Sequence, residues 1–214
     1  MSPNVEHLAT QLTSSLGGSA AELPWLWPAL LRALAHGEPV TPDDLATVTG
    51  RDLTEVRAGL AALSDTEYDK QGRVVGHGIT LNPTPHRFQV DGHRLYTWCA
   101  LDTLIFPAVI DRPAHITSPC HATGIPVRVE VTPQRVVRVE PAGAVVSILA
   151  PDGGSPVRSA FCDHVHFFAS ATAATPWLRT HPEASVMAVH EAFTLGQQLT
   201  HTLLSDTATG SGCC

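Results

Sequence analysis

In the first third of the chain, hydrophobic residues recur every three or four positions, which is the spacing of an α-helix. Glycine, proline and polar capping residues separate these runs. The pattern predicts four helices: one from Val5 to Leu16, one that follows Pro24 and ends at Gly37, one that Thr41 caps and that ends near Gly50, and one from Thr54 to Leu63, with Asp52 or Thr54 as its cap.

A strand and turn pattern follows the last of these helices. Residues 67–75 predict two short strands that turn at Gln71-Gly72. Three helices and a hairpin are typical of a winged helix, whose usual function is DNA binding. The expected recognition helix offers only Arg57 as a basic residue, which favours a structural or lid role. We therefore expect a winged-helix-like N-terminal domain over residues 1–82.

From about residue 83 the periodicity changes to that of β-strands. Valines alternate with polar residues over 127–131, and Pro133-Gln134 turns the chain into a second strand over 135–140. Further segments predict three strands, of which the middle one is expected to be central, and two helices: strands at 144–150, 159–168 and 185–189, a short helix opening at Thr175-Pro176, and a terminal helix. The fold class is α+β, with a mixed core of antiparallel strands and flanking helices over 83–206 and a flexible tail over 207–214.

Composition and charge narrow the function. The chain carries 13 Lys and Arg against 20 Asp and Glu, a net charge of -7, so we expect no nucleic acid partner. No apolar run reaches 18 residues and no secretory leader is evident, which indicates a cytoplasmic protein without membrane contact. The five cysteines form no CxxC pair, so reduced thiols are expected rather than disulfides or a zinc ribbon. Nucleophile-elbow and phosphate-loop motifs are absent from the sequence.

Cys99 and Asp102 are three residues apart in an otherwise apolar run. On a helix, this spacing places a thiol and a carboxylate one turn apart on one face. A carboxylate raises the pKa of a neighbouring thiol and can accept its proton, which suits a soft metal ion better than acyl transfer. A carboxylate on an apolar face needs a function or a partner. We therefore take the pair as a candidate site.

Cys162 lies in another segment rich in aromatic residues. If the helix that carries Cys99 packs on a sheet that contains this segment, the two cysteines could lie close together. On the predicted strand, Cys162, His164 and His166 share one face and could bind zinc with Cys99 or Cys120. Two-residue spacing is unusual for structural zinc, so we prefer packed histidines and a structural Cys120. The terminal pair, Cys213 and Cys214, is either incidental or a mobile dithiol for soft-metal transfer.

Five segments resemble the alkylmercury (organomercurial) lyase family, and the likeness spans roughly residues 20 to 204. The segments are Arg94–Pro107, Phe161–Ser170, Ser64–Lys70, Val139–Gly143 and Val189–Gly196. The resemblance implies protonolytic cleavage of carbon–mercury bonds to a hydrocarbon and Hg(II), as in mercury detoxification. It implies Cys99, Asp102 and Cys162 as the catalytic set and as transient mercury ligands, and a structural Cys120. Asp163 stands where some members have a further cysteine.

The resemblance further implies that no cofactor is needed, that excess small thiols support turnover, and that Hg(II) can be handed to a mercuric reductase. Two other functions remain open on the residues alone. A metal-responsive winged-helix transcription regulator would have the same layout, and a zinc-stabilised binding module would use the same cysteines and histidines.

Overall fold

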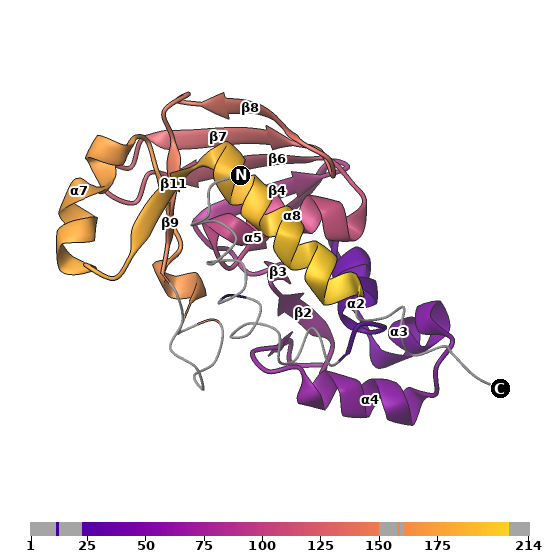
Figure 1. The fold of residues 1–214 in the computed structure, drawn as a ribbon. Helices are drawn as coiled ribbons and strands as arrows, with labels where there is room; N and C mark the ends of the chain where they lie inside the picture. The colour runs from indigo at the N-terminus through magenta and orange to yellow at the C-terminus, as the bar shows by residue number, and fades with distance from the viewer. Residues whose placement is uncertain (1–11, 13–22, 150–157, 159–160, 206–214) are drawn as a thin grey trace.

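The protein is an α+β structure in which helices pack against antiparallel sheets (Figure 1). The structure, a computed structural model, describes residues 12, 23–149, 158 and 161–205. The predicted helix from Val5 to Leu16 lies almost wholly outside these residues, as do Cys213 and Cys214. No helix in the described part is long and apolar enough to cross a membrane.

Three of the four predicted N-terminal helices fall within the described residues, and all three are present. They are α2 (Trp27–Leu34), α3 (Pro42–Thr49) and α4 (Leu53–Ala62), and Asp52 is the N-cap residue of α4. Thr41 and Asp44 form a capping box at α3, in which the Asp44 N–H donates to Thr41 Oγ1 at 3.1 Å and the Thr41 N–H donates to Asp44 Oδ2 at 2.9 Å. Both groups would otherwise lack helical partners, so the box fixes where α3 starts.

One antiparallel sheet joins the N-terminal hairpin to the core. Its order is β1-β2-β3-β5-β4-β6-β7-β8. The strands are β1 (Glu67–Tyr68), β2 (Val74–His77), β3 (Ile79–Thr80), β4 (His86–Val90), β5 (His93–Thr97), β6 (Ala114–Pro119), β7 (Pro126–Val131) and β8 (Val136–Glu140). The predicted hairpins β1–β2 and β7–β8 are confirmed. Alternating burial along β4 and β6 shows that one face of the sheet covers the core.

A second, three-stranded sheet lies beside the first (Figure 1). In it β9 (Val145–Ile148) is flanked by β10 (Phe167–Phe168) and β11 (Ser185–Ala188). The predicted strand over 159–168 is wrong for most of its length, since only Phe167–Phe168 pairs, and at an edge rather than centrally. The short helix also starts earlier than predicted: α7 (Ala171–Thr180) is capped by the Ser170 hydroxyl, and Pro176 lies inside it.

The helix α5 (Ala100–Ile110) is the centre of the core. It is buried nearly all round, which fits its almost continuous apolar sequence. The long helix α8 (Val189–Ser205) crosses over it (Figure 1). A Cβ at Gly196 would lie 2.8 Å from Cγ1 of Ile105, so glycine is needed for this close approach. The two helices therefore pack closely against each other at Ile105.

Candidate active site

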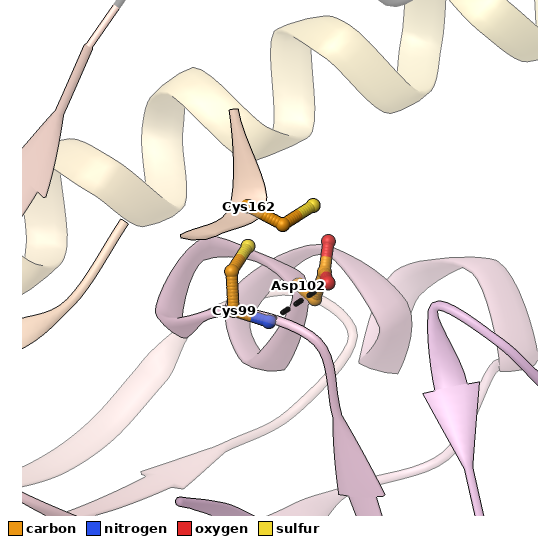
Figure 2. Close-up of side chains that lie close together, drawn as sticks. All are labelled: Cys99, Asp102 and Cys162. Atoms are coloured by element: carbon orange, nitrogen blue, oxygen red, sulfur yellow. Dashed lines mark hydrogen bonds between the residues drawn. The ribbon is translucent and has the colours of Figure 1, made fainter. Parts of the chain in front are cut away.

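Cys99 is the N-cap residue of α5, immediately before its first turn. Its backbone is extended (φ -142°, ψ 173°), so the prediction that Cys99 and Asp102 both lie within a helix is wrong in detail. The three-residue spacing still brings them together, because Asp102 occupies the third helical position and closes a capping box. The Cys99 N–H donates to Asp102 Oδ2 at 3.1 Å (Figure 2), and the Cys99 sulfur accepts the Asp102 N–H.

Cys162 begins a single 3₁₀ turn, η1 (Cys162–His164), rather than lying on a strand. Two anchors position this turn. The Ala100 N–H donates to the Val165 carbonyl at 3.1 Å, which ties the turn to the start of α5. The Ser147 hydroxyl donates to the His164 carbonyl and accepts the His166 N–H, each at 2.9 Å, which ties it to β9. Cys162 therefore lies against the beginning of α5.

The two sulfur atoms and one carboxylate oxygen converge on one point. The ligand atoms of Cys99, Asp102 and Cys162 all lie within 4.8 Å of one another, and no other group of three or more Cys, His, Asp or Glu in the described chain does so. Figure 2 shows the three side chains facing one another across the gap between α5 and the Cys162 segment. Both cysteines are free and buried. Two thiols and a carboxyl form a ligand set suited to a soft metal ion.

Burial and the neighbouring charges keep both thiols protonated. Burial raises the pKa of Cys99 well above its ordinary value, and a hydrogen bond to Cys162 and the charge of Asp102 act in the same direction. At Cys162, the hydrogen bond from Cys99 lowers the pKa, but burial and the charges of Asp102 and Asp163 raise it more, so the net shift is upward. Arg158 offsets part of this rise.

The carboxyl group of Asp102 has a raised pKa, so it can carry a proton near neutral pH. Burial of its carboxyl group raises its pKa to about 7, although hydrogen bonds from Cys99 and from the Trp98 backbone act in the opposite direction. An aspartate with its ordinary pKa of 3.8 would stay ionised at neutral pH. This carboxyl group can accept a proton from a thiol and give it up again near pH 7.

The other predicted ligands lie elsewhere. His166 stacks on His121 with ring centroids 3.9 Å apart, and His164 lies 5.9 Å from the His181 ring, so the structure does not gather the histidines around Cys162 as a zinc site would require. Burial of His166, together with the neighbouring imidazoles, lowers its pKa to about 3.

Cys120 is buried at the end of β6, outside the three-residue cluster. Its backbone closes a tight turn, with the Gly124 N–H donating to the Cys120 carbonyl at 2.8 Å. Burial alone would raise its thiol pKa, but hydrogen bonds from the Thr123 hydroxyl and from the backbone N–H groups of Ala169, Thr123 and Ala122 outweigh it and lower the pKa. This environment agrees with a residue that organises its turn.

Two residues close to the cysteines share a partner that their sequence positions did not indicate. Trp98 precedes Cys99, and its indole N–H donates to Glu67 Oε1 at 2.8 Å. Arg158, four residues before Cys162, also donates to Glu67. The only signal in the sequence was an acidic residue in the predicted hairpin, and neither of its partners is close to it in the chain.

The fold and the site define an α+β enzyme with a helix-turn-helix part and a centre of two thiols and one carboxyl group. Comparisons with known proteins agree with this class. The family described as alkylmercury lyase matches residues 79–201, and the helix-turn-helix domain of alkylmercury lyase matches residues 7–78. The chain belongs to the alkylmercury lyase family, whose activity is the cleavage of carbon–mercury bonds in organomercurials to a hydrocarbon and Hg(II).

Curated relatives match along the whole chain. An alkylmercury lyase of Streptomyces lividans is 55% identical, with 100% of both chains covered. One of Staphylococcus epidermidis is 52% identical, covering 99% of this chain and 98% of the relative. The solved structure of the mercury-bound form of MerB2 has the same fold, with a TM-score of 0.73 at 24% identity over 93% of this chain and 98% of that one. The enzyme prediction and the α+β fold class are confirmed, and these matches give no support to a transcription regulator.

Proposed function

We propose that Cys99, Cys162 and Asp102 are the catalytic residues of carbon–mercury bond cleavage in this chain. The observation that carries the proposal is the convergence of their ligand atoms within 4.8 Å. Mercury is a soft cation that prefers thiolates to nitrogen or oxygen donors, so two thiols at this separation can compete for an organomercurial held by an external thiol.

The first step is an exchange of thiols on mercury. One protein thiol loses its proton to the departing external thiolate, and its sulfur binds the organomercurial through a new sulfur–mercury bond. Cys162 is the more favourable entry point, because its pKa is raised less than that of Cys99: it accepts the hydrogen bond from Cys99, and the positive charge of Arg158 offsets part of the rise. The carbon–mercury bond stays intact in this step.

The second step breaks the carbon–mercury bond. Asp102 as a carboxylate accepts the proton of the second thiol, and the resulting thiolate binds mercury. The electron pair of the carbon–mercury bond then takes the proton back from the Asp102 carboxylic acid, which releases the hydrocarbon and regenerates the carboxylate. A carboxyl group with a pKa of about 7 suits both transfers. Hg(II) remains on two thiolates until external thiols displace it.

The remaining parts of the proposal concern partners. The chain needs no cofactor, and excess low-molecular-weight thiols complete turnover and allow hand-off to a mercuric reductase. The net charge of -7 supports the absence of nucleic acid binding. The three described cysteines are free thiols, which supports a location in the reducing cytoplasm.

Release of benzene from phenylmercury in the presence of excess small thiol tests this assignment. Cys99→Ala, Cys162→Ala and Asp102→Ala should each nearly abolish release, because each removes a sulfur ligand or the proton carrier. Cys120→Ala serves as the thiol control, measured at a temperature where it remains folded, and should retain most of the cleavage rate. Full activity of Asp102→Ala would refute the proton transfer, and activity in both site-cysteine variants would refute the mechanism.

A further inference from the structure

Glu67 lies at a β-bulge of the N-terminal hairpin and receives four hydrogen bonds on its carboxylate. The register between β1 and β2 shifts at Glu67/Tyr68, and such bulges redirect a side chain. Oε2 accepts the Thr80 hydroxyl and the Asn82 amide, both at 2.6 Å. A Cβ at Gly76 would lie 2.6 Å from the same oxygen, so the glycine leaves room for the carboxylate.

The other oxygen of Glu67 binds one residue from each cysteine segment. Oε1 accepts the Trp98 indole N–H at 2.8 Å and an Arg158 guanidinium N–H at 2.5 Å. The Arg158 guanidinium also lies over the Trp98 ring, 5.1 Å from its centroid, in cation–π geometry. Trp98 is bonded to Cys99 through the chain, and Arg158 lies four residues before Cys162.

Glu67 keeps its negative charge at neutral pH. Burial alone would raise the pKa of Glu67, but the hydrogen bonds from Thr80, Asn82 and Trp98 and the charge of Arg158 outweigh it, so the pKa is lowered. Only 14% of the Glu67 side chain is exposed, against 40% of that of Arg158. Glu67 is thus the fixed anion of the cluster, and Arg158 is its more exposed partner.

We propose that Glu67 and Arg158 are positioning residues. Their contact fixes Trp98, the neighbour of Cys99, relative to Arg158, so that both site sulfur atoms lie at the separation needed to bind one mercury ion. The network joins the N-terminal part, through Glu67, to segments 31 and 91 residues away. Catalytic geometry depends on such supports, and a misplacement of about 1 Å can reduce a rate by about a hundredfold. The inference rests on the assignment of Cys99 and Cys162 as mercury ligands.

The test is a double-mutant cycle on the full chain with Glu67→Gln, Arg158→Met and the double variant. Glu67→Gln keeps the shape of the side chain and loses its charge, while Arg158→Met keeps most of the length and loses the guanidinium. We expect kcat for benzene release from phenylmercury to fall about 10- to 100-fold in each single variant, with a smaller change in KM. The double variant should be no more than about twofold slower than the slower single variant, because all three lose the same interaction.

Two controls separate positioning from stability. Arg112→Met removes an exposed ion pair with Asp91 (2.7 Å) and should change neither kcat nor Tm. Arg158→Met should likewise keep its Tm within a few degrees, since its side chain is partly exposed, whereas Arg158→Lys should recover part of the rate. Effects that simply add, or a kcat loss in proportion to a loss of Tm, would overturn the proposal.

A parallel measurement on Cys162→Ala separates the positioning role of Arg158 from the catalytic assignment of Cys162. If Cys162→Ala is inactive and Arg158→Met cleaves at the wild-type rate, the positioning role is wrong and the catalytic assignment stands. If Cys162→Ala is active, the catalytic assignment itself fails, and the positioning role fails with it.

Discussion

Asp102 combines a structural contact and a raised pKa in one carboxyl group. It accepts the Cys99 N–H at the start of α5, and burial raises its pKa to about 7. In the unfolded chain the carboxyl group has its ordinary pKa of 3.8. The folded state therefore binds more protons than the unfolded state between these values, and the contribution of Asp102 to stability is lost as pH rises from about 4 through 7.

Asp102→Asn should therefore stabilise the fold above pH 7 while abolishing cleavage. Asparagine keeps an oxygen for the Cys99 N–H and carries no charge to desolvate, so the variant avoids the loss that the wild type suffers as pH rises. Its gain in unfolding free energy over the wild type should be up to about 4 kcal/mol larger at pH 8 than at pH 4. Urea unfolding at the two pH values measures this. Asp44→Asn is the matched control: Asp44 has the same place in the α3 capping box but a lowered pKa, and its loss should destabilise instead. If both variants change the unfolding free energy in the same direction at pH 8, the opposite pKa shifts of Asp102 and Asp44 are wrong.

Asp163 contributes to the raised pKa of its neighbour Cys162. Its exposed carboxylate raises the Cys162 pKa, so Asp163→Asn should lower that pKa and increase the thiolate fraction at neutral pH. The alkylation rate of Cys162, followed on its peptide by mass spectrometry, should rise about two- to fivefold, as expected for an exposed charge. Glu183→Gln, an exposed change on another segment, should leave the rate unchanged. If Cys162 is alkylated more slowly in Asp163→Asn than in the wild type, Asp163 does not raise the Cys162 pKa.

At the scale of elements, the loop between β2 and β3 depends on one glycine. Gly78 has φ +79°, and its carbonyl accepts the Trp98 N–H at 3.0 Å. A Cβ at this position would lie 2.5 Å from Cζ of Phe106. Phe106 belongs to α5, and its ring packs against Trp27 of the N-terminal part. Backbone conformation and packing both require glycine there.

Gly78→Ala should destabilise the protein by more than Gly72→Ala. Both glycines have positive φ, so each substitution costs about 1–2 kcal/mol of backbone strain, but a Cβ at Gly72 meets nothing within 4 Å. The additional cost of Gly78→Ala is that of overpacking, about 1–3 kcal/mol. Chemical denaturation of the two variants measures the difference. Equal losses would show that Phe106 moves aside without cost.

Elements with a strong local signal were predictable, and elements defined by remote partners were not. The ends of α3 could be predicted from Thr41-Pro42 and Gly50, because helix capping and termination by a left-handed residue depend only on nearby residues. The alternating residues 159–168 suggested a strand, but the Ser147 hydroxyl and the start of α5 take hydrogen bonds that a strand would use. Cys162 consequently turns toward Cys99, and nothing within its own segment encodes this.

At the scale of the whole molecule, two buried histidines link stability to pH. Burial lowers the pKa of His77 and of His86 to about 4, against an ordinary value of 6.5. His77 packs on Trp98, and His86 bonds Ser118 between β4 and β6. Because the unfolded state binds more protons than the folded state between pH 6.5 and 4, stability falls as pH decreases through this range.

His86→Gln should therefore lose less stability on acidification than the wild type. Each histidine contributes about 3 kcal/mol to the fall in unfolding free energy between pH 7 and pH 4. The variant removes one such contribution, and glutamine can still bond Ser118. His115→Gln, an exposed change on β6, should keep the wild-type pH dependence. Urea unfolding across this range decides, and identical slopes for all three proteins would contradict the linkage.

The sequence and the structure contributed different parts of the site. The proposed catalytic residues Cys99, Asp102 and Cys162 were accessible from their spacing and from the family resemblance. Glu67 and Arg158 were not, because their partners are 31 and 91 residues away and only the folded sheet and the Cys162 segment bring them together. The division of the chain at residue 82 stays a prediction, while β3 and β5 join both sides of it in one sheet.

The capping box at the start of α5 has a consequence for spectroscopy. The Cys99 N–H donates to Oδ2 of Asp102, whose carboxyl group is proposed to carry the catalytic proton. Neutralising that oxygen weakens a charge-assisted hydrogen bond and so changes the electronic environment of one backbone nitrogen. The amide resonance of Cys99 is therefore an intrinsic reporter of the charge on Asp102, readable in the intact enzyme without a label at the reacting groups.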